Sequence, residues 1–539
     1  MATRPEIILR GGTVVDGSGR RPAFRGDVAI AGERIVAIEP ALPAADDARE
    51  IRVDDLVVAP GFIDIHSHSD FTLLRDPRAV SQISQGVTTE IVGNCGYGCC
   101  PIRDAALAQE AIYGYDPSPP LTWRDLDGYF DRLQRARPAV NVAALVPNGQ
   151  MRIAVLGMAD RPARACEVER MAELLREGLD QGAAGYSTGL EYPWESAATE
   201  EEITALCRVV AEAGGLYATH TRNRDEAAVE AIDEAIRTAR AAGARLQISH
   251  LTPRGGADDT ARALDRVDLA LGQGQDLAFD MHTRLFGTTG LKVLLPSWAL
   301  AGGRDALARR LADPAERARM RGSRSLISAV GDWRRVVLYD APSRPDLAGM
   351  TFAEIATRAE KDPFDCALDI LRDELDALHR PMVLLTTYDE AVLRDTYAHR
   401  LCAVASDATA LAPDGPLAGA VFHGAYTWAS WFFRRMIRET GAFTLEEGIH
   451  RLTGLPAERV GLADRGVLEP GGRADIAVID PARFGERGTT FDPNRLAKGL
   501  VHLLVNGAAT IEDGRPTGRR AGRILRRWGG RATGVRVEA

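Results

Sequence analysis

The chain has 539 residues, more than one ordinary domain needs, so we expect a large domain accompanied by a smaller one. Its 66 basic and 75 acidic residues give a formal net charge of −9, which argues against nucleic acid or an anionic membrane as the main partner. No apolar run is long enough to cross a bilayer, and the opening residues lack the long apolar core of a signal peptide. The seven cysteines, an odd number thinly spread, predict no disulfide framework and favour a reducing, cytoplasmic location.

Both ends of the chain are rich in β-type segments. Short runs of β-favouring residues at 7–9, 13–15, 27–30 and 34–38 are separated by glycine-containing turns. Runs at 475–479 and 503–505 have the same texture, and the second is followed by Asn506-Gly507, a pair that favours tight hairpins. We therefore expect one small β-sandwich domain built from residues 1–60 and 461–539.

The middle of the chain, 61–460, alternates short apolar strands with long helical patterns. Helices are expected at 167–181 and 225–242, and a third begins at Thr199, where Thr199-Glu200-Glu201-Glu202 matches a capping box. Strand followed by helix, repeated, predicts a parallel sheet with helical crossovers. Eight candidate strands predict an α/β fold with a (β/α)8 TIM-like barrel; they end near His68, Cys95, Val146, Leu190, His220, His250, His282 and Asp407.

Two further β-like runs do not fit the count of eight. We place the run at 336–338 in an insertion after the seventh strand, and the run at 382–385 has no assigned place.

Metal-ligand residue types gather at the ends of the expected strands. In Gly61-Phe62-Ile63-Asp64-Ile65-His66-Ser67-His68, the two histidines lie one pleat apart and face the same side of a strand. An isolated His-x-His is more often a surface pair, and a lone histidine or cysteine is more often structural. Four more such residues end other strands, where (β/α) barrels build their sites: Cys95, His220, His250 and Asp407. Together the six residues predict a metal site.

The ligand types select the ion. Histidine, thiolate and carboxylate suit zinc, whereas magnesium and calcium prefer oxygen. Six candidate ligands exceed one tetrahedral zinc with an open position. Two arrangements remain open: two metals bridged by the Cys95 thiolate, or one zinc held tightly by Cys95, His220 and His250 beside a second, weaker site.

Several motifs show a family resemblance. The Gly-Phe-Ile-Asp-x-His-x-His signature at 61–68 resembles the amidohydrolase superfamily. Longer stretches resemble its D-aminoacylase (N-acyl-D-amino-acid deacylase) family, over nearly the whole chain: Ser84–Thr89, Gly93–Gly96, Ser187–Pro193, Gln247–Leu251, Leu452–Ala457, Gly466–Leu468 and Ala474–Ile476. The bridging lysine of many relatives is absent, and Cys95 stands where this family has its bridging cysteine.

The resemblance implies a site and a reaction. It implies His66, His68 and Asp407 as ligands of a weaker metal, and Cys95, His220 and His250 as ligands of a tighter zinc. Asp407 would also be the general base and then the general acid, and an insertion near 286–345 would cover the site. The implied reaction is zinc-dependent hydrolysis of the amide bond of a small N-acyl amino acid, such as an N-acyl-D-amino acid, by metal-activated hydroxide. The sequence leaves the oligomeric state open, a homo-oligomer included.

The match breaks at positions expected to touch the substrate. The family usually has a lysine where this chain has Thr252, and a Tyr-Pro-Tyr stretch where it has His282-Thr283-Arg284. The family's Gly-His pair is replaced by Pro147-Asn148-Gly149, and its His-Pro-Arg stretch by Phe422-His423-Gly424. The resemblance therefore supports the type of reaction more firmly than the identity of the substrate. Arginines can grip a carboxylate with two parallel hydrogen bonds, although most arginines are solvated surface charges. The candidate substrate contacts are Tyr192, Arg152, Arg222, Arg224, His282 and Arg284, with Asp64 orienting a ligand from behind.

Three alternatives compete with this reading. A cyclic amidase of the hydantoinase or dihydroorotase type and a heterocycle deaminase use similar ligands, but the missing bridging lysine and the quoted stretches argue against the first. A non-enzymatic scaffold should have lost ligands, and all six are present.

Overall fold

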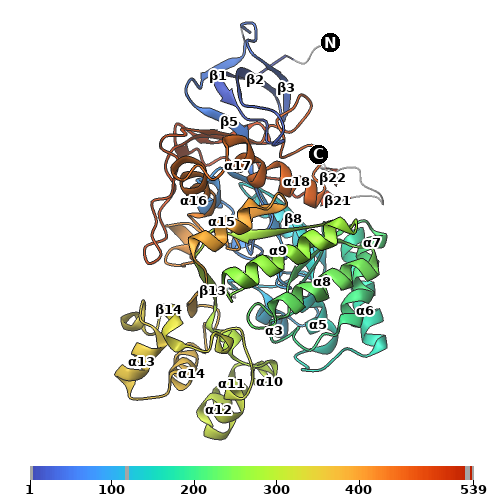
Figure 1. Cartoon of the computed structure of the whole chain (residues 1–539), viewed down its shortest axis with the longest axis vertical. Helices are drawn as coiled ribbons and strands as arrows, with labels where there is room; N and C mark the ends of the chain where they lie inside the picture. The colour runs from blue at the N-terminus through green and yellow to red at the C-terminus, as the bar shows by residue number, and fades with distance from the viewer. Residues whose placement is uncertain (1–3, 46, 116–119, 528–534, 537–539) are drawn as a thin grey trace.

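The computed structural model describes residues 4–45, 47–115, 120–527 and 535–536. Along its long axis it shows a β domain at one end, a barrel in the middle and a mixed α/β extension at the other end (Figure 1). The N-terminal strands, in blue, and the late strands and helices, in red, lie together at the β-domain end of the barrel (Figure 1).

Eight parallel strands form the barrel. Their order is β16-β12-β11-β10-β9-β8-β7-β6, so neighbours in sequence are neighbours in space. The sheet closes where Ser67 bridges Ala408 in parallel and Asp407 N–H donates to the carbonyl of His66 at 2.9 Å. The predicted (β/α)8 barrel is confirmed; its strands are β6 (Phe62–Asp64), β7 (Val87–Val92), β8 (Asn141–Pro147), β9 (Gly185–Gly189), β10 (Leu216–His220), β11 (Arg245–Ile248), β12 (Leu277–His282) and β16 (Cys402–Ala405).

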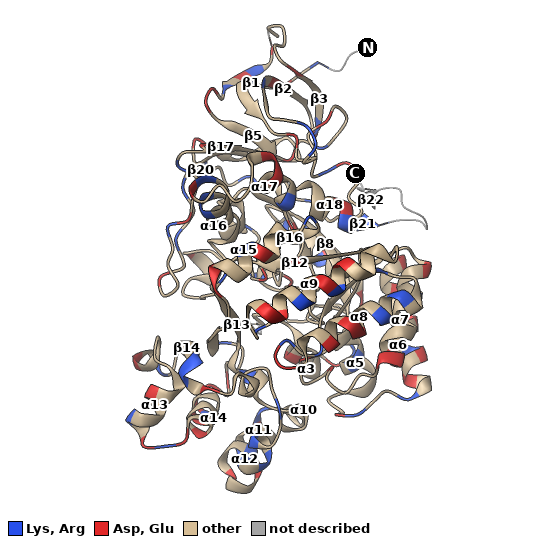
Figure 2. Cartoon of the chain, viewed as in Figure 1, with Lys and Arg blue, Asp and Glu red and all other residues tan. Residues whose placement is uncertain are grey.

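Amphipathic helices cover the barrel. The expected helices at 167–181 and 225–242 are α6 (Ala165–Asp180) and α8 (Ala228–Ala242). Thr199 caps α7 (Glu200–Glu212), since its side chain accepts from Glu202 N–H. The other long helices around the barrel are α4 (Leu126–Ala136), α5 (Asn148–Leu156), α9 (Ala257–Gly272), α15 (Glu390–Ala398), α17 (Leu445–Leu452) and α18 (Gly454–Val460). Acidic and basic positions are both present along α6 to α9 in this view (Figure 2).

Strands from both ends of the chain share one sheet. Its order is β20-β19-β18-β17-β5-β1-β2-β3, with β4 paired to β1. The central contact is between the two ends, because β17 pairs antiparallel with β5, with Ile476 opposite Pro60. Asn506 and Gly507 form the β18–β19 turn with positive φ angles of 49° and 76°, which the mirror-image hairpin turns require. The strands are β1 (Ile7–Val14), β2 (Phe24–Ala31), β3 (Arg34–Glu39), β4 (Arg49–Arg52), β5 (Val57–Pro60), β17 (Ile476–Ile479), β18 (Leu500–Val505), β19 (Ala508–Glu512) and β20 (Arg515–Pro516).

A long insertion separates the seventh and eighth barrel strands. Three antiparallel strands, in the order β13-β15-β14, form its sheet: β13 (Phe286–Gly290), β14 (Val336–Asp340) and β15 (Met382–Thr386). The run at 382–385 is therefore the middle strand of this sheet, and the insertion runs beyond the expected 286–345. Its helices include α11 (Gly303–Ala312), α12 (Pro314–Arg321), α13 (Phe352–Ala359) and α14 (Pro363–Asp373). They pack around an apolar core with Leu307, Leu338, Phe352 and Phe364, which continues into Tyr97 and Trp194 of the barrel.

Among the described helices, none combines the length and the apolar composition that a bilayer crossing needs.

Candidate metal centre and active site

The six ligand-type residues all lie at the carboxyl ends of barrel strands. His66 and His68 follow β6, Cys95 follows β7, His220 ends β10, His250 follows β11 and Asp407 follows β16. Three of them, Cys95, His250 and Asp407, have positive φ angles of 54°, 35° and 43°. Non-glycine residues adopt this left-handed conformation at a cost, and such residues cluster at functional sites. The backbone thus turns sharply after each of these three strands, at the barrel mouth.

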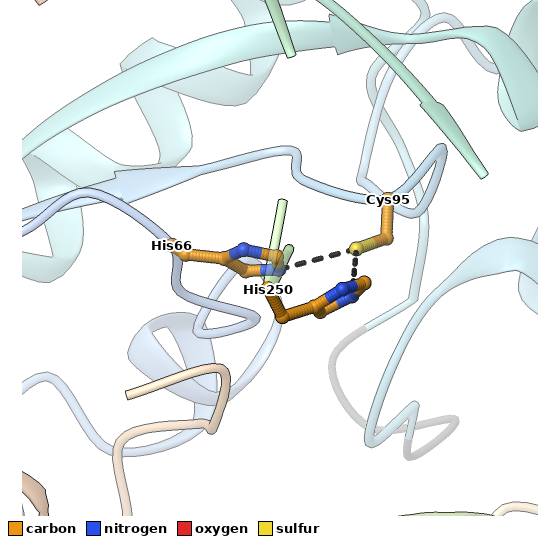
Figure 3. A group of neighbouring side chains, drawn as sticks. All are labelled: His66, Cys95 and His250. Carbon is orange, nitrogen blue, oxygen red and sulfur yellow. Dashed lines mark hydrogen bonds between the residues drawn. The ribbon is translucent and has the colours of Figure 1, made fainter. Parts of the chain in front are cut away.

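One group of donor atoms combines two imidazoles and a thiol. His66 Nε2 lies 3.1 Å from Cys95 Sγ, and His250 Nε2 lies 3.7 Å from the same sulfur. The side chains come from three different loops and converge on one point (Figure 3). All three are buried, and their ligand atoms lie within 4.8 Å of one another.

A second group shares His66 with the first. His68 Nε2 is 3.3 Å from Asp407 Oδ1, and His66 Nε2 is 3.5 Å from the same oxygen. These three ligand atoms also lie within 4.8 Å of one another. Two donor groups that meet at His66 have the layout of a two-ion site or of one ion with a choice of ligands.

His220 lies beside these groups and is also held by Glu191. Its Nε2 is 2.9 Å from Glu191 Oε2, and its ring stacks edge-on against the His250 ring at a centroid distance of 4.6 Å. Its Nδ1 is buried without a hydrogen-bond partner. The His220 ring also interacts with the Cys95 thiol. The expected grouping of Cys95, His220 and His250 therefore stays a prediction, beside the group in which His66 joins Cys95 and His250.

Asp280, in β12, supports the ligands from behind and was missed by the sequence analysis. Its Oδ1 accepts from His66 Nδ1 at 2.9 Å and from the His250 backbone N–H at 2.9 Å, and Gln247 donates to its Oδ2 at 3.0 Å. A carboxylate at Nδ1 fixes the ring so that Nε2 faces the site. Asp64, expected in this role, accepts the backbone N–H of His66 at 3.4 Å and that of Ser406 at 3.0 Å.

Charges around the site favour the metal-binding forms of Cys95, His250 and Asp407, whereas anionic neighbours outweigh burial and raise the pKa values of His66 and His68. Burial opposes ionisation of Cys95, but the neighbouring imidazoles, His66 foremost, hold the pKa of its thiol well below the usual range. Burial and the positive charge of Arg224 lower the pKa of His250 to about 4, so its ring is neutral. Burial would raise the pKa of Asp407, but Arg284 and the histidines outweigh it and hold that pKa well below its usual value.

The residues present fit a bound metal ion. Nitrogen, sulfur and carboxylate donors suit a borderline-soft divalent ion. The Nε2 of His220 is taken by Glu191, and its buried Nδ1 has no hydrogen-bond partner, an unfavourable state unless another group supplies the interaction.

A cavity of about 560 Å³, including its open mouth, lies over these ligands. Barrel loops and the insertion both line it, the latter with Thr288, Thr289, Leu326 and Leu385. Several walls are aromatic, from Tyr97, Tyr113, Tyr192, Tyr388 and Phe422.

The candidate substrate contacts divide into those that line this cavity and those that do not. Tyr192, His282 and Arg224 line it. Arg284 lies behind Asp407 and donates to Asp407 Oδ2 at 2.6 Å, so its charge is already paired. Arg222 and Arg152 do not line the cavity. Arg222 is bound by Glu234, and Arg152 is buried against Glu202.

Comparison with known proteins shows which family the chain belongs to. The model of the amidohydrolase family matches residues 50–511, so the chain belongs to the amidohydrolase family. It is 32% identical to an N-acyl-D-glutamate deacylase of Alcaligenes xylosoxydans xylosoxydans, covering 98% of each chain. It is also 32% identical to a D-aminoacylase of that organism, covering 97% of this chain and 98% of the relative.

A solved structure of a related enzyme has a similar fold. The N-acyl-D-glutamate deacylase of Bordetella bronchiseptica, complexed with zinc and a phosphonate inhibitor that mimics the tetrahedral intermediate, superposes with a TM-score of 0.79. It is 29% identical, and the match covers 97% of this chain and 100% of that one. The resemblance to the D-aminoacylase family is thus confirmed over the whole fold.

Proposed function

We propose that the protein is a zinc-dependent amidohydrolase that cleaves the linear amide bond of N-acyl amino acids, N-acyl-D-amino acids among them. The observation that carries this proposal is the pair of buried donor groups sharing His66 beneath the cavity. The relatives matched over nearly their whole length are named as deacylases, which favours this reaction over ring opening or deamination. All seven cysteines are free, which supports a reducing compartment such as the cytoplasm.

The proposed metal ligands are those that the two groups bring together, with His220 adjacent. His66, Cys95 and His250 would hold one zinc, and His68 and Asp407 would complete a second, weaker position with His66. When bound, zinc lowers the pKa of a coordinated water and polarises the substrate carbonyl.

Asp407 is the proposed proton carrier. Its Oδ2 is occupied by Arg284, and its Oδ1 faces His68 and His66, so Oδ1 is the oxygen free to exchange protons at the site. Its lowered pKa keeps it ionised and ready to accept a proton from the attacking water. The same oxygen can then return that proton to the leaving nitrogen, as a single carboxylate can do in both directions.

The insertion would shelter the reaction. Leu326 and Leu385 bring apolar surface to the cavity wall over the ligands, which limits access of bulk water.

Asp407→Asn tests the assignment. We expect kcat to fall by about 10²–10⁴-fold, because the amide cannot accept the proton, while the zinc content measured by elemental analysis stays close to that of the wild type. Asp414→Asn is the matched control, since this exposed carboxylate is paired with Arg78 at 2.9 Å and lies outside the cavity. Full turnover by Asp407→Asn would overturn the role given to Asp407.

A substrate panel tests the reaction class. Zinc-loaded protein is assayed against N-acetyl-D- and N-acetyl-L-amino acids, hydantoin, dihydroorotate and amino-heterocycles, and free amine and ammonia are measured separately. Release of free amino acid supports the proposal. Ring opening or ammonia release without it would replace the proposal with a cyclic amidase or a deaminase.

A further inference from the structure

Arg224 is a buried cation in the wall of the cavity. It follows β10 by four residues, is 8% exposed and lines the cavity beside His220 and His250. Buried arginines are ordinarily paired with a carboxylate, because an unpaired buried charge is costly.

Within the described part of the chain, only one of the three guanidinium nitrogens of Arg224 has hydrogen-bond partners. Only Nη2 is engaged, donating to the His250 carbonyl at 2.6 Å, the Thr252 carbonyl at 3.1 Å and the Tyr388 hydroxyl at 2.7 Å. These three acceptors are neutral. Nε is buried and has no hydrogen-bond partner.

The other arginines around the site are already paired. Arg254, which also lines the cavity, is bound by Glu191 and lies 3.2 Å from Asp225. Arg284 is bound by Asp407, and Arg222 by Glu234. Within the described part of the chain, no carboxylate lies within ion-pair distance of Arg224, whereas each of these neighbours has one.

We propose that Arg224 is the specificity-determining residue that binds the carboxylate of the N-acyl amino acid. The inference rests on the proposed function and names the group by which this chain recognises its substrate. The N–H groups of Nη1 would donate to a carboxylate oxygen, and the positive charge of the guanidinium makes this a charge-assisted hydrogen bond. Thr252, nearby on the adjoining loop, is neutral and supplies no competing charge.

The anchoring of Nη2 suits this role. Because it bonds the carbonyl of His250, the guanidinium is fixed relative to a metal ligand, and a carboxylate held by Nη1 would lie within the same cavity. The hydroxyl of Tyr388, from the end of the insertion, accepts from the same Nη2 and adds to this anchoring. A preorganised guanidinium loses little entropy on binding.

The test compares charged and neutral forms of one substrate. For the best N-acetyl amino acid of the panel and its carboxamide, kcat/KM is measured for the wild type and for Arg224→Gln. We expect the wild type to prefer the carboxylate, and Arg224→Gln to lose about 10- to 100-fold on the carboxylate, mainly in KM, with little change on the carboxamide. The ratio of the two values within one preparation is independent of how much protein holds an intact metal centre.

Matched controls separate this inference from structural damage. Arg222→Gln makes the same change two residues earlier, outside the cavity, and should leave the ratio unchanged. Should Arg224→Gln fail to fold, Arg224→Lys keeps a positive charge without the planar guanidinium and should give an intermediate ratio. An unchanged ratio in the folded variant would overturn the proposal.

Binding without turnover distinguishes the failure of this inference from that of the proposed function. Calorimetry on metal-free protein with N-acetyl-D-leucine and its carboxamide should show a preference for the carboxylate that Arg224→Gln abolishes. If zinc-loaded wild type hydrolyses none of the panel, the proposed function fails, while this titration still decides whether Arg224 binds the carboxylate. Equal binding of both compounds by the wild type would overturn the role of Arg224.

Discussion

The geometry of the candidate metal centre depends on Asp280, a side chain that does not line the cavity. Asp280 joins two of the ligands, since one of its oxygens accepts from the ring of His66 and from the backbone of His250. It therefore fixes both the direction of one imidazole and the turn that presents the other.

Asp280→Asn should weaken metal binding by about 10- to 100-fold, because the amide cannot hold the His66 ring with the same polarity. Zinc affinity measured by competition with a chromophoric chelator checks this. Asp268→Asn, at an exposed carboxylate on α9, is the control and should bind zinc as the wild type does. Unaltered affinity in Asp280→Asn would show that packing alone orients His66.

At the residue scale, sequence predicted the ligand positions but not all of their partners. His66, Cys95 and His250 could be found because each stands at the end of a strand-like run, where barrel geometry brings residues together. Asp280 is an acidic residue inside a strand, and its neighbour His282 drew attention instead. No sequence signal told which histidine would turn toward Glu191, since that contact depends on the fold of two separate loops.

Among the secondary-structure elements, the barrel was the most predictable part and the insertion the least. The barrel strands alternate with helices at regular spacing, which identifies them locally. β14 and β15 are instead paired with partners distant in sequence, with Val337 opposite Leu384, so no local pattern could assign them. The middle strand β15 therefore had no place until its neighbours were known.

Most of the apolar core around Leu338 comes from the insertion itself, and we expect the insertion to unfold separately from the barrel. Leu338 is fully buried there, and Leu338→Ala should cost about 2–5 kcal/mol locally by leaving a cavity. Limited proteolysis should then cut within 291–381 faster than in the wild type, with KM raised and zinc content retained. Leu269→Ala, at a side chain 54% exposed, should change none of these. Loss of zinc in Leu338→Ala would show that the insertion and the barrel unfold together.

Over the whole molecule, a buried polar network joins the barrel to the β domain. Asp475 Oδ2 accepts from Asn141 in β8 at 3.1 Å and is paired with Arg465, while Oδ1 accepts the backbone N–H of Asn506 at 2.7 Å. The motif around Asp475 was noticed in the sequence only as a family likeness, because its partner Asn141 is 334 positions away.

Asp475→Ala should lower the free energy of unfolding by about 3–5 kcal/mol, since it leaves the buried Arg465 without a counter-charge. Urea denaturation followed by far-UV circular dichroism measures this. Arg495→Met, which removes an exposed ion pair with Asp492, should change it by less than about 1 kcal/mol. A loss of similar size in both variants would argue against a special role for the buried network.

The shared sheet of the two chain ends also bears on how the protein is made. β5 lies between β1 and β17, so one of its two neighbours is supplied by residues 476–479, translated long after it. During synthesis the early strands must wait with an unpaired edge while the barrel and insertion emerge from the ribosome. At roughly 5–20 residues per second, that wait lasts on the order of tens of seconds. Nascent chains stalled before β17 should therefore be strong clients of chaperones that shield strand edges.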